Sequence, residues 1–290
     1  MDVKPENGIP TMPKEEIVKL LETSLPRVQR YLVGLYVNGR RDIFSGIYIK
    51  CCGYEGILTA WHCLKDWGEE PVSFLILENW HSFMVSTCYL ERLCIAYSRE
   101  SGRPDLAFII IKESGITSEL KRLGIEFYDL EANWIRLNEV LCEPYAKAHW
   151  VIAGTPEETV IQRNVVAQPN VKPDLFFDAQ SMLLRTNFVQ RRFQGEYDYL
   201  TLKPISGMGG FPERFKGMSG GGIWYLQLKT EDNNCYEVVP ILAGMLCWDS
   251  KNATAEEGHL YREVEGHGWD SIYAFVQKAL SEKRAKEKLD

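Results

Sequence analysis

FKGMSGGGIW, residues 215–224, places one serine, Ser219, among four glycines directly before an apolar run. An exposed nucleophile needs a backbone that turns sharply, approaches the substrate closely and directs its N–H groups toward one point, and glycine permits all three. A serine hydroxyl is a weak nucleophile on its own, so a base has to lie within hydrogen-bond reach. The stretch therefore predicts a nucleophile turn, although a serine in a glycine-rich turn also has a purely structural interpretation.

Two residues far upstream have the chemistry to activate this serine. His62 ends the apolar run Gly56–Trp61, and Asp105 stands directly before the apolar stretch Leu106–Ile111, where a carboxylate without a partner is costly. In a triad, such a carboxylate accepts a hydrogen bond from the base imidazole and fixes its tautomer. Taken singly, His62 has the alternative of a strand-end histidine and Asp105 that of a turn residue. The order histidine, aspartate, serine along the chain is that of the chymotrypsin group.

The composition is that of an ordinary soluble globular protein, with 290 residues, 45% of them apolar and 25% charged. A net charge of −7 without a basic stripe argues against a surface that follows phosphates, and so against nucleic acid as a partner. The N-terminus has no apolar signal core, and Leu106–Ile111 is far too short to cross a bilayer. We expect a cytoplasmic protein with neither a nucleic acid nor a membrane as partner.

The eight cysteines include the adjacent pair Cys51 and Cys52, and also Cys88 and Cys94, six positions apart. None forms a CxxC pair, and their spacing suggests no zinc site. We therefore expect buried free thiols and not disulfides, with no metal and no cofactor. The other histidines (His81, His149, His259 and His267) are expected to be structural or exposed, with His267 in a loop. Three tryptophans, Trp61, Trp224 and Trp248, are expected in the core or in a cleft wall.

Short β-rich runs bounded by turn residues recur from Tyr31 to about residue 250, Trp134–Val140 among them, and indicate barrels or sandwiches. Residues 14–33 open as a helix with a one-sided apolar stripe, which Pro26 should bend or end. Helical spacing returns between Trp269 and Leu280, and a solvated charged tail is expected over residues 281–288.

Three blocks together resemble a known family, the trypsin-like serine peptidases. Thr59–Cys63 (TAWHC) is similar to that family's histidine block, Asp105–Ala107 (DLA) to its aspartate block and Gly217–Gly221 (GMSGG) to its serine block. Three further pieces agree with the family: Phe44–Gly46, Val151–Pro156 and Gly244–Trp248. The six pieces fall within residues 30–280 and keep the family's order.

The resemblance implies an all-β chymotrypsin-like fold of two six-stranded antiparallel Greek-key barrels, with helices added at both ends. It divides the chain into a helical extension (1–30), a first barrel (31–140), a second barrel (141–262) and a C-terminal helix with its charged tail (263–290). The active site would lie in the cleft between the two barrels.

The resemblance also implies a role for each site residue. Ser219 would attack the scissile carbonyl, His62 would transfer the proton and Asp105 would orient His62. The N–H groups of Gly217 and Ser219 would form the oxyanion hole, and Cys247, Trp248 and Asp249 would pair with the substrate backbone. Glu213 would lie at the floor of the first specificity pocket and Asp249 at its wall. Two carboxylates there suggest cleavage after Arg or Lys, although Glu213 next to Arg214 could equally form a solvated pair.

The departures from the family bear on control and not on chemistry. Cys63 lacks the upstream partner cysteine of secreted members, Met218 replaces the usual acidic residue before the nucleophile, and Gly222 replaces a common proline. No activation-cleavage sequence precedes Tyr31. These features resemble intracellular and bacterial relatives, which have neither disulfides nor zymogen activation.

A cytoplasmic protease of this kind needs restraint by narrow specificity, by a misaligned resting site or by a regulatory protein partner.

Taken together, the three blocks predict a serine endopeptidase that acts on polypeptides. The alternatives are a catalytically silent pseudo-peptidase that binds peptides or proteins, and an esterase or acyl transferase using the same triad.

Overall fold

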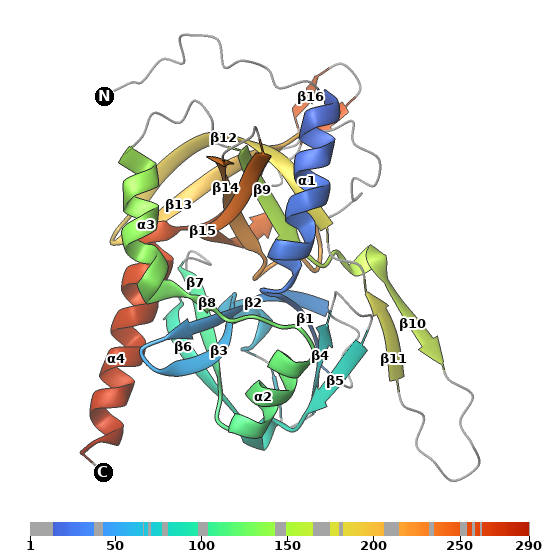
Figure 1. Cartoon of the computed structure of the whole chain (residues 1–290). Coiled ribbons are helices and arrows are strands. Elements are labelled where there is room, and N and C mark those ends of the chain that lie inside the picture. Colours follow the sequence, from blue (N-terminus) through green and yellow to red (C-terminus); the bar gives the residue numbers. More distant parts are fainter. Residues whose placement is uncertain are drawn as a thin grey trace.

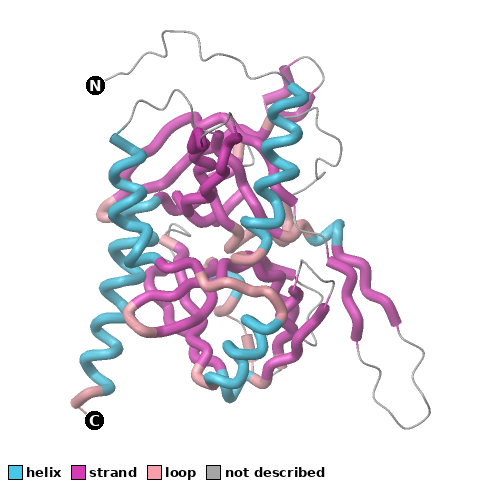
Figure 2. Tube along the Cα trace, viewed as in Figure 1, coloured by secondary structure: helices cyan, strands magenta, loops and turns pink. Residues whose placement is uncertain are grey.

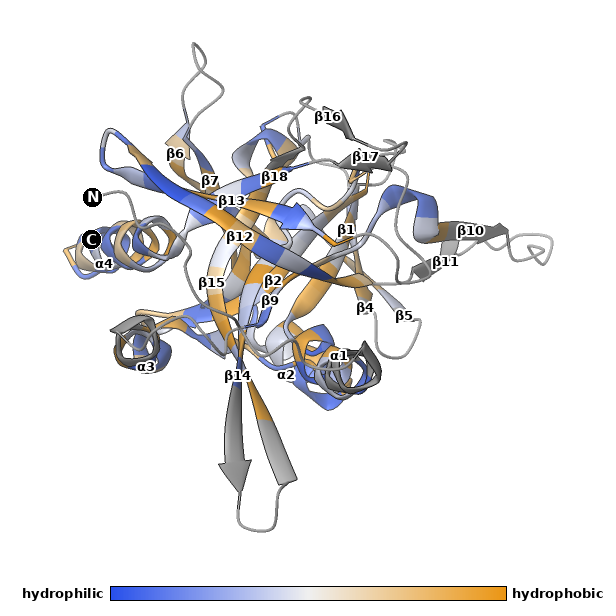
Figure 3. Ribbon diagram, turned by 90° about the horizontal axis from the view of Figure 1, so that it is seen from above, coloured by the Kyte–Doolittle hydropathy of each residue, from blue (hydrophilic) through white to orange (hydrophobic). Residues whose placement is uncertain are grey.

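The structure is a computed structural model. It describes residues 14–37, 43–65, 67–68, 71–76, 81–97, 104–142, 149–164, 175–179, 182–205, 215–231, 235–249, 254–256, 259–261 and 263–289. Two β units lie one above the other, and the helices cover them from outside (Figure 1, Figure 2). Seen from above, the helices α1 (Lys14–Gln29), α3 (Leu130–Cys142) and α4 (Val276–Glu287) lie outside the strands along two sides of the molecule (Figure 3).

The first unit is a sheet of eight strands. Its order is β5-β4-β1-β2-β3-β7-β6, with β8 added in parallel to β2. The strands are β1 (Leu32–Val37), β2 (Ile43–Cys51), β3 (Tyr54–Thr59), β4 (Val72–Ile76), β5 (His81–Val85), β6 (Leu90–Tyr97), β7 (Asp105–Ile111) and β8 (Tyr128–Asp129). β7 is buried along its whole length, as its continuous apolar sequence requires.

The second unit is a closed barrel of six strands in the order β12-β13-β18-β15-β14-β9. These are β9 (His149–Gly154), β12 (Met182–Gln194), β13 (Tyr197–Pro204), β14 (Gly222–Glu231), β15 (Cys235–Asp249) and β18 (Val264–Gly268). Two small hairpins stand apart from it: β10 (Val160–Asn164) with β11 (Leu175–Ala179), and β16 (Thr254–Glu256) with β17 (His259–Tyr261). The first hairpin projects from the side of the molecule (Figure 1).

The mostly β architecture is confirmed, and the closed six-stranded barrel is found in the second half. The first half differs from the expected six-stranded barrel, because among the described residues its ladder runs from β5 to β6 without closing. β8 is one strand more than expected. β1 pairs with Ile43–Ile47 of β2, and beyond the end of β1 the same edge of β2 pairs with β8 at Ile49 and Lys50. The barrel's last strand, β18, lies at Val264–Gly268.

Trp134–Val140 is helical, and the expectation of a strand there was wrong. The segment belongs to α3 (Leu130–Cys142). Leu130 and Leu137, seven positions apart, are both buried, which is helical spacing. Asp129 caps the helix start by accepting a hydrogen bond from the Ala132 N–H at 2.9 Å. The helix period and the cap therefore outweigh the local β-rich composition.

The helix predicted near the N-terminus is α1 (Lys14–Gln29), with Pro26 inside its last turn. α2 spans Ser114–Arg122. At the C-terminus, a π-helical turn, η5 (Ser271–Phe275), leads into α4 (Val276–Glu287). No helix in the described part of the chain is long and apolar enough to span a membrane.

The charged end of the chain is exposed over most of residues 281–288, as the sequence suggested, and it is helical. α4 continues through it to Glu287 and contacts the first sheet. Lys283 forms an ion pair with Glu91 of β6 at 2.6 Å, and Arg284 donates to the Cys52 carbonyl oxygen at 3.1 Å. The charges therefore fasten the C-terminal helix to the first sheet.

Aromatic side chains join the two β units. Tyr31 stacks on Trp224 of β14 with ring centroids 5.7 Å apart, and Tyr128 meets the same indole edge-on at 5.5 Å. The Tyr128 hydroxyl accepts a hydrogen bond from the Leu242 N–H, and the Tyr273 hydroxyl donates to the Leu242 carbonyl oxygen. These contacts fix one sheet against the other and therefore fix residues that the two units contribute to a shared site.

Candidate active site

Strand pairing brings His62 to Asp105. β3 pairs antiparallel with β7, with Thr59 opposite Ala107, so the end of β3 lies beside the start of β7. His62 follows β3 in the short 3-10 helix η1 (Trp61–Cys63), and Asp105 is the first residue of β7. The register of the two strands therefore places two residues 43 positions apart in direct contact.

Asp105 binds His62 through both carboxylate oxygens. Oδ1 accepts the His62 backbone N–H at 2.8 Å, and Oδ2 contacts the imidazole Nδ1. The Asp105 side chain is 1% exposed, whereas that of His62 is 33% exposed. A buried carboxylate held in this way fixes the imidazole ring and leaves Nε2 for other chemistry.

A second histidine contacts Asp105 from the interior. His267 lies on β18 and is fully buried, so the expected loop position was wrong. Its Nε2 accepts the Asp105 backbone N–H at 3.1 Å, and burial lowers its pKa to about 4. His267 is therefore neutral near pH 7, and it positions the start of β7 without adding charge.

The turn that holds Ser219 is fastened to the first sheet through Ser45 of β2. The Ser45 N–H donates to the Ser219 carbonyl oxygen at 2.9 Å, and the Ser45 hydroxyl donates to the Gly217 carbonyl oxygen at 2.7 Å. The same hydroxyl accepts the Thr155 N–H at 2.8 Å. One buried serine therefore joins the turn, the barrel and the first sheet.

Two glycines in this turn have backbone angles that L side chains rarely adopt, with φ of +91° at Gly217 and +87° at Gly220. A Cβ at Gly220 would lie 2.1 Å from the Ser45 carbonyl oxygen. The glycine-rich sequence is thus required by both conformation and close approach. Among the described residues, the N–H groups of Gly217 and Ser219 donate to no protein acceptor.

Ser219 lies in the same region as His62 but is not bonded to it. Its hydroxyl donates to the Cys247 carbonyl oxygen at 3.3 Å, and within the described ranges no hydrogen bond joins it to His62. His62 Nε2 instead lies 3.5 Å from the Cys63 thiol. The structure thus couples His62 to Asp105 and holds the serine hydroxyl on β15.

The structure describes only some of the expected substrate-binding residues. Cys247 is buried on β15, and Trp248 and Asp249 continue that strand opposite Glu265 and Val264 of β18. Pairing of β15 with β14 ends at Met245, so the edge at 247–249 is not used by β14. Glu213 lies outside the described residues.

The cysteine side chains that the structure describes are free, as expected, but not all are buried. Cys51, Cys52, Cys63 and Cys247 are buried, whereas Cys88 and Cys94 are exposed. Burial raises the pKa of the Cys247 thiol well above its usual range, so it is a neutral neighbour of the Asp105 backbone carbonyl.

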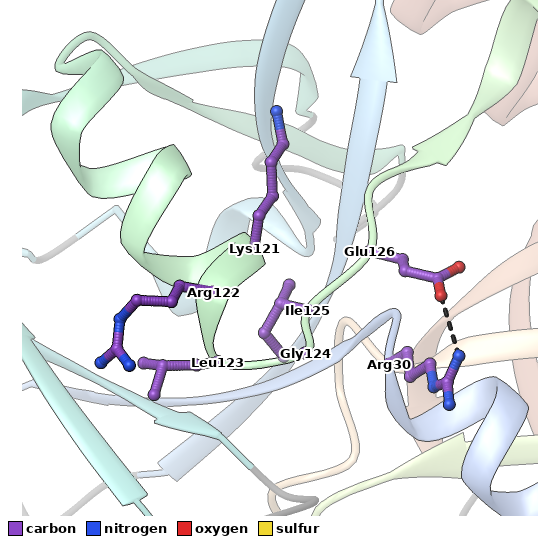
Figure 4. A pocket seen from close by; sticks show the side chains of 7 residues that line it. All are labelled: Arg30, Lys121, Arg122, Leu123, Gly124, Ile125 and Glu126. Atoms are coloured by element: carbon purple, nitrogen blue, oxygen red, sulfur yellow. Dashed lines mark hydrogen bonds and ion pairs between the residues drawn. The ribbon is translucent and has the colours of Figure 1, made fainter.

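A pocket of about 430 Å³ lies away from these residues, at the C-terminal end of α2 (Figure 4). It is lined by Arg30, Lys121, Arg122, Leu123, Gly124, Ile125 and Glu126. Its three cations are each paired with a carboxylate: Arg30 with Glu126, Lys121 with Glu55, and Arg122 with Glu119. The pocket contains none of the proposed triad, and we assign it no catalytic part.

No protein-family model matches the chain, and no curated protein matches it. A solved crystal structure, that of a thermostable serine protease AL20 from an extremophilic microorganism, is similar over 87% of this chain and 98% of its own. The TM-score is 0.45 and the sequence identity 11%. The site is therefore interpreted from its own geometry.

Replacing Ser45 by alanine should destabilise the protein. The substitution leaves the Gly217 carbonyl and the Thr155 N–H without their buried partner, and an unsatisfied buried group costs about 1–3 kcal/mol. We expect Ser45→Ala to lower the free energy of unfolding in urea by about 2 kcal/mol. Ser73→Ala, at a buried serine of β4 in the same sheet, is the matched control. Equal losses in the two variants would contradict the role given to Ser45.

The buried neutral His267 should make stability depend on pH. Its pKa is lowered in the fold from 6.5 to about 4, so the unfolded chain binds the extra proton between these values. This contribution is complete above pH 6.5 and is lost as the pH falls toward 4, by about 3 kcal/mol. We expect His267→Gln, which keeps an acceptor but does not titrate, to flatten urea-unfolding stability over that interval. Parallel pH curves for the two proteins would contradict a neutral His267.

Proposed function

We propose that the protein is a serine endopeptidase that hydrolyses peptide bonds through His62, Asp105 and Ser219. The observation that carries the proposal is the buried Asp105 carboxylate bound to His62 Nδ1 in the same region as a glycine-rich turn with a serine at its centre. A carboxylate that orients an imidazole, next to a serine in such a turn, is the arrangement required for acyl transfer at neutral pH.

In the proposed reaction, Ser219 Oγ attacks the scissile carbonyl while His62 Nε2 takes its proton. His62 then returns the proton to the leaving amine, and Asp105 stabilises the imidazolium in between. The N–H groups of Gly217 and Ser219 are proposed to bind the oxyanion, because neither is used by a described acceptor. Water completes the cycle by hydrolysing the acyl-enzyme in the reverse sequence of proton transfers.

The proposed substrate is an extended polypeptide that adds to β15 at residues 247–249, along the edge that no described strand occupies. Main-chain hydrogen bonds to a strand edge bind extended peptides without regard to side chain. That edge is continuous with the Cys247 carbonyl, which already contacts the Ser219 hydroxyl. The position of the strand therefore supports a peptide substrate over a small ester.

A second candidate, a silent pseudo-peptidase, is favoured by one observation. The Ser219 hydroxyl is bonded to Cys247 and not to His62. The same contact suits a resting enzyme whose serine rotates toward His62 when substrate or a regulatory partner binds.

The cytoplasm is our proposed compartment, because the described cysteines are free thiols, which a reducing environment maintains.

A fluorophosphonate probe should label the wild-type protein at Ser219. Ser219→Ala should abolish labelling, and Asp105→Asn should slow it by roughly 10⁴-fold, because the imidazole loses its correct tautomer. Ser86→Ala, at an exposed serine, is the matched control and should label normally. The site is read by peptide mass spectrometry. Labelling that survives Ser219→Ala would remove Ser219 as the nucleophile, and no labelling of the wild type would favour the pseudo-peptidase.

Cleavage after Arg or Lys is our proposed specificity, resting on Asp249 next to the substrate edge and on Glu213. We expect kcat/KM for an arginine peptide to exceed that for the matched leucine peptide. Asp249→Asn should reduce that ratio by roughly tenfold, the equivalent of losing 1.4 kcal/mol of charge pairing. Glu119→Gln, at an exposed carboxylate on α2, is the control. Equal rates on the two peptides in the wild type would exclude a basic preference.

A further inference from the structure

The turn between β2 and β3 holds two adjacent thiols. Cys51 pairs with Tyr54, and the two residues between them, Cys52 and Gly53, have φ of 52° and 82°. Positive φ at both central positions is what a two-residue hairpin turn requires. Cys52 Sγ lies 3.6 Å from Cys51 Sγ, and both residues are buried, so the hairpin turn holds the two thiols together.

A carboxylate from another element completes a three-ligand group. Glu131, near the start of α3, accepts the Cys52 N–H through Oε2 at 2.8 Å. The two sulfur atoms and a carboxylate oxygen lie within 4.8 Å of one another. Glu131 is exposed, so the group is open to solvent on that side. α4 covers another side, with the Ser281 hydroxyl 3.2 Å from Cys52 Sγ.

We propose that Cys51, Cys52 and Glu131 bind a zinc-like divalent cation. Zn²⁺ takes both thiolate and carboxylate ligands, whereas Mg²⁺ and Ca²⁺ take oxygen ligands, so the two thiolates select for Zn²⁺. A water molecule could take the fourth coordination position from the exposed side. The Ser281 hydroxyl, 3.2 Å from Cys52 Sγ, is another oxygen close to the proposed ion. Cys51 and Cys52 are adjacent in the sequence and match no zinc-binding spacing. The fold brings the third ligand, Glu131, next to them.

The separation of the sulfur atoms distinguishes a metal from a disulfide. With Zn–S bonds of about 2.3 Å, two thiolates of a tetrahedral site lie about 3.8 Å apart, close to the observed 3.6 Å. A disulfide would require the sulfurs to approach to about 2.05 Å, with Cα atoms about 3.8 Å apart, below the usual range for a disulfide. The existing geometry therefore fits a bridging cation with little movement.

The charge balance and the position of the site also fit. Two thiolates and a carboxylate around a divalent ion leave one net negative charge, and the Arg284 guanidinium lies next to it, donating to the Cys52 carbonyl oxygen at 3.1 Å. The ligands come from the first sheet and α3, and α4 packs on them. A bound ion would therefore stabilise the junction of all three elements, independently of any peptidase activity.

The test uses the full-length protein, reduced and freed of metal with a chelator, and Co²⁺ as a spectroscopic substitute for Zn²⁺. We expect one equivalent of Co²⁺ to give thiolate-to-metal charge-transfer absorption and the intense visible bands of a tetrahedral site. Stoichiometric Zn²⁺ should displace the Co²⁺ and raise the Tm. Cys51→Ser and Cys52→Ser should each weaken binding by at least tenfold, and Glu131→Gln should weaken it while both thiolate bonds persist.

Cys88→Ser, at an exposed thiol in the turn before β6, and Cys94→Ser, at an exposed thiol on β6, are matched controls and should bind Co²⁺ as the wild type does. The proposal is overturned if the reduced wild type shows no charge-transfer band, whether or not the variants fold. It is also overturned if the band survives loss of both Cys51 and Cys52. A wild type that instead loses two hydrogen atoms in mass on mild peroxide treatment and never binds Co²⁺ would identify a redox pair.

Discussion

The hydrogen bonds of Ser45 join the serine turn and the barrel to the first β unit, which carries His62 and Asp105. This buried residue of β2 binds the Ser219 carbonyl with its N–H and the Gly217 carbonyl with its hydroxyl, and it accepts the Thr155 N–H. The base and its carboxylate belong to the first sheet, whereas the serine turn leads into the barrel. Without this contact, the turn and the imidazole would be positioned by separate elements. Their relative geometry therefore depends on this residue together with the aromatic contacts that join the two β units.

Asp105 lies between two histidines that the fold makes chemically different. His267 is buried on β18 with a pKa lowered to about 4, so it is neutral and accepts a backbone N–H. His62 is partly exposed and bonded to the carboxylate itself. In the proposed reaction, His62 is the histidine whose Nε2 is open to a substrate, because its ring is partly exposed and its Nδ1 contacts the carboxylate. The difference in burial, and not the residue type, thus separates the structural role of His267 from the proposed catalytic role of His62.

Local patterns predicted the parts of the site that are local. The apolar run after Asp105 is a buried strand, and two of the glycines around Ser219, Gly217 and Gly220, occupy positions with positive φ. Ser45 and His267 were missed because their functions arise from hydrogen bonds across 172 and 162 positions of the chain. A strand was expected at Trp134–Val140 because this run contains the β-formers Trp134, Ile135 and Val140, while the helix cap at Asp129 was overlooked. Contacts distant in sequence leave no local pattern to read.

The Cys247 carbonyl links substrate binding to the nucleophile in the proposed enzyme. It is the acceptor for the Ser219 hydroxyl, and it begins the strand edge to which an extended peptide would add. A carbonyl oxygen has two lone pairs, so a peptide N–H that bonds to it shares the oxygen with the hydroxyl and weakens the bond between them. A hydroxyl released from the weakened bond needs a new acceptor, and His62 Nε2 is the nitrogen left by the contact of Nδ1 with Asp105. Binding in the correct register would thus assemble the triad, and without substrate the serine would stay idle.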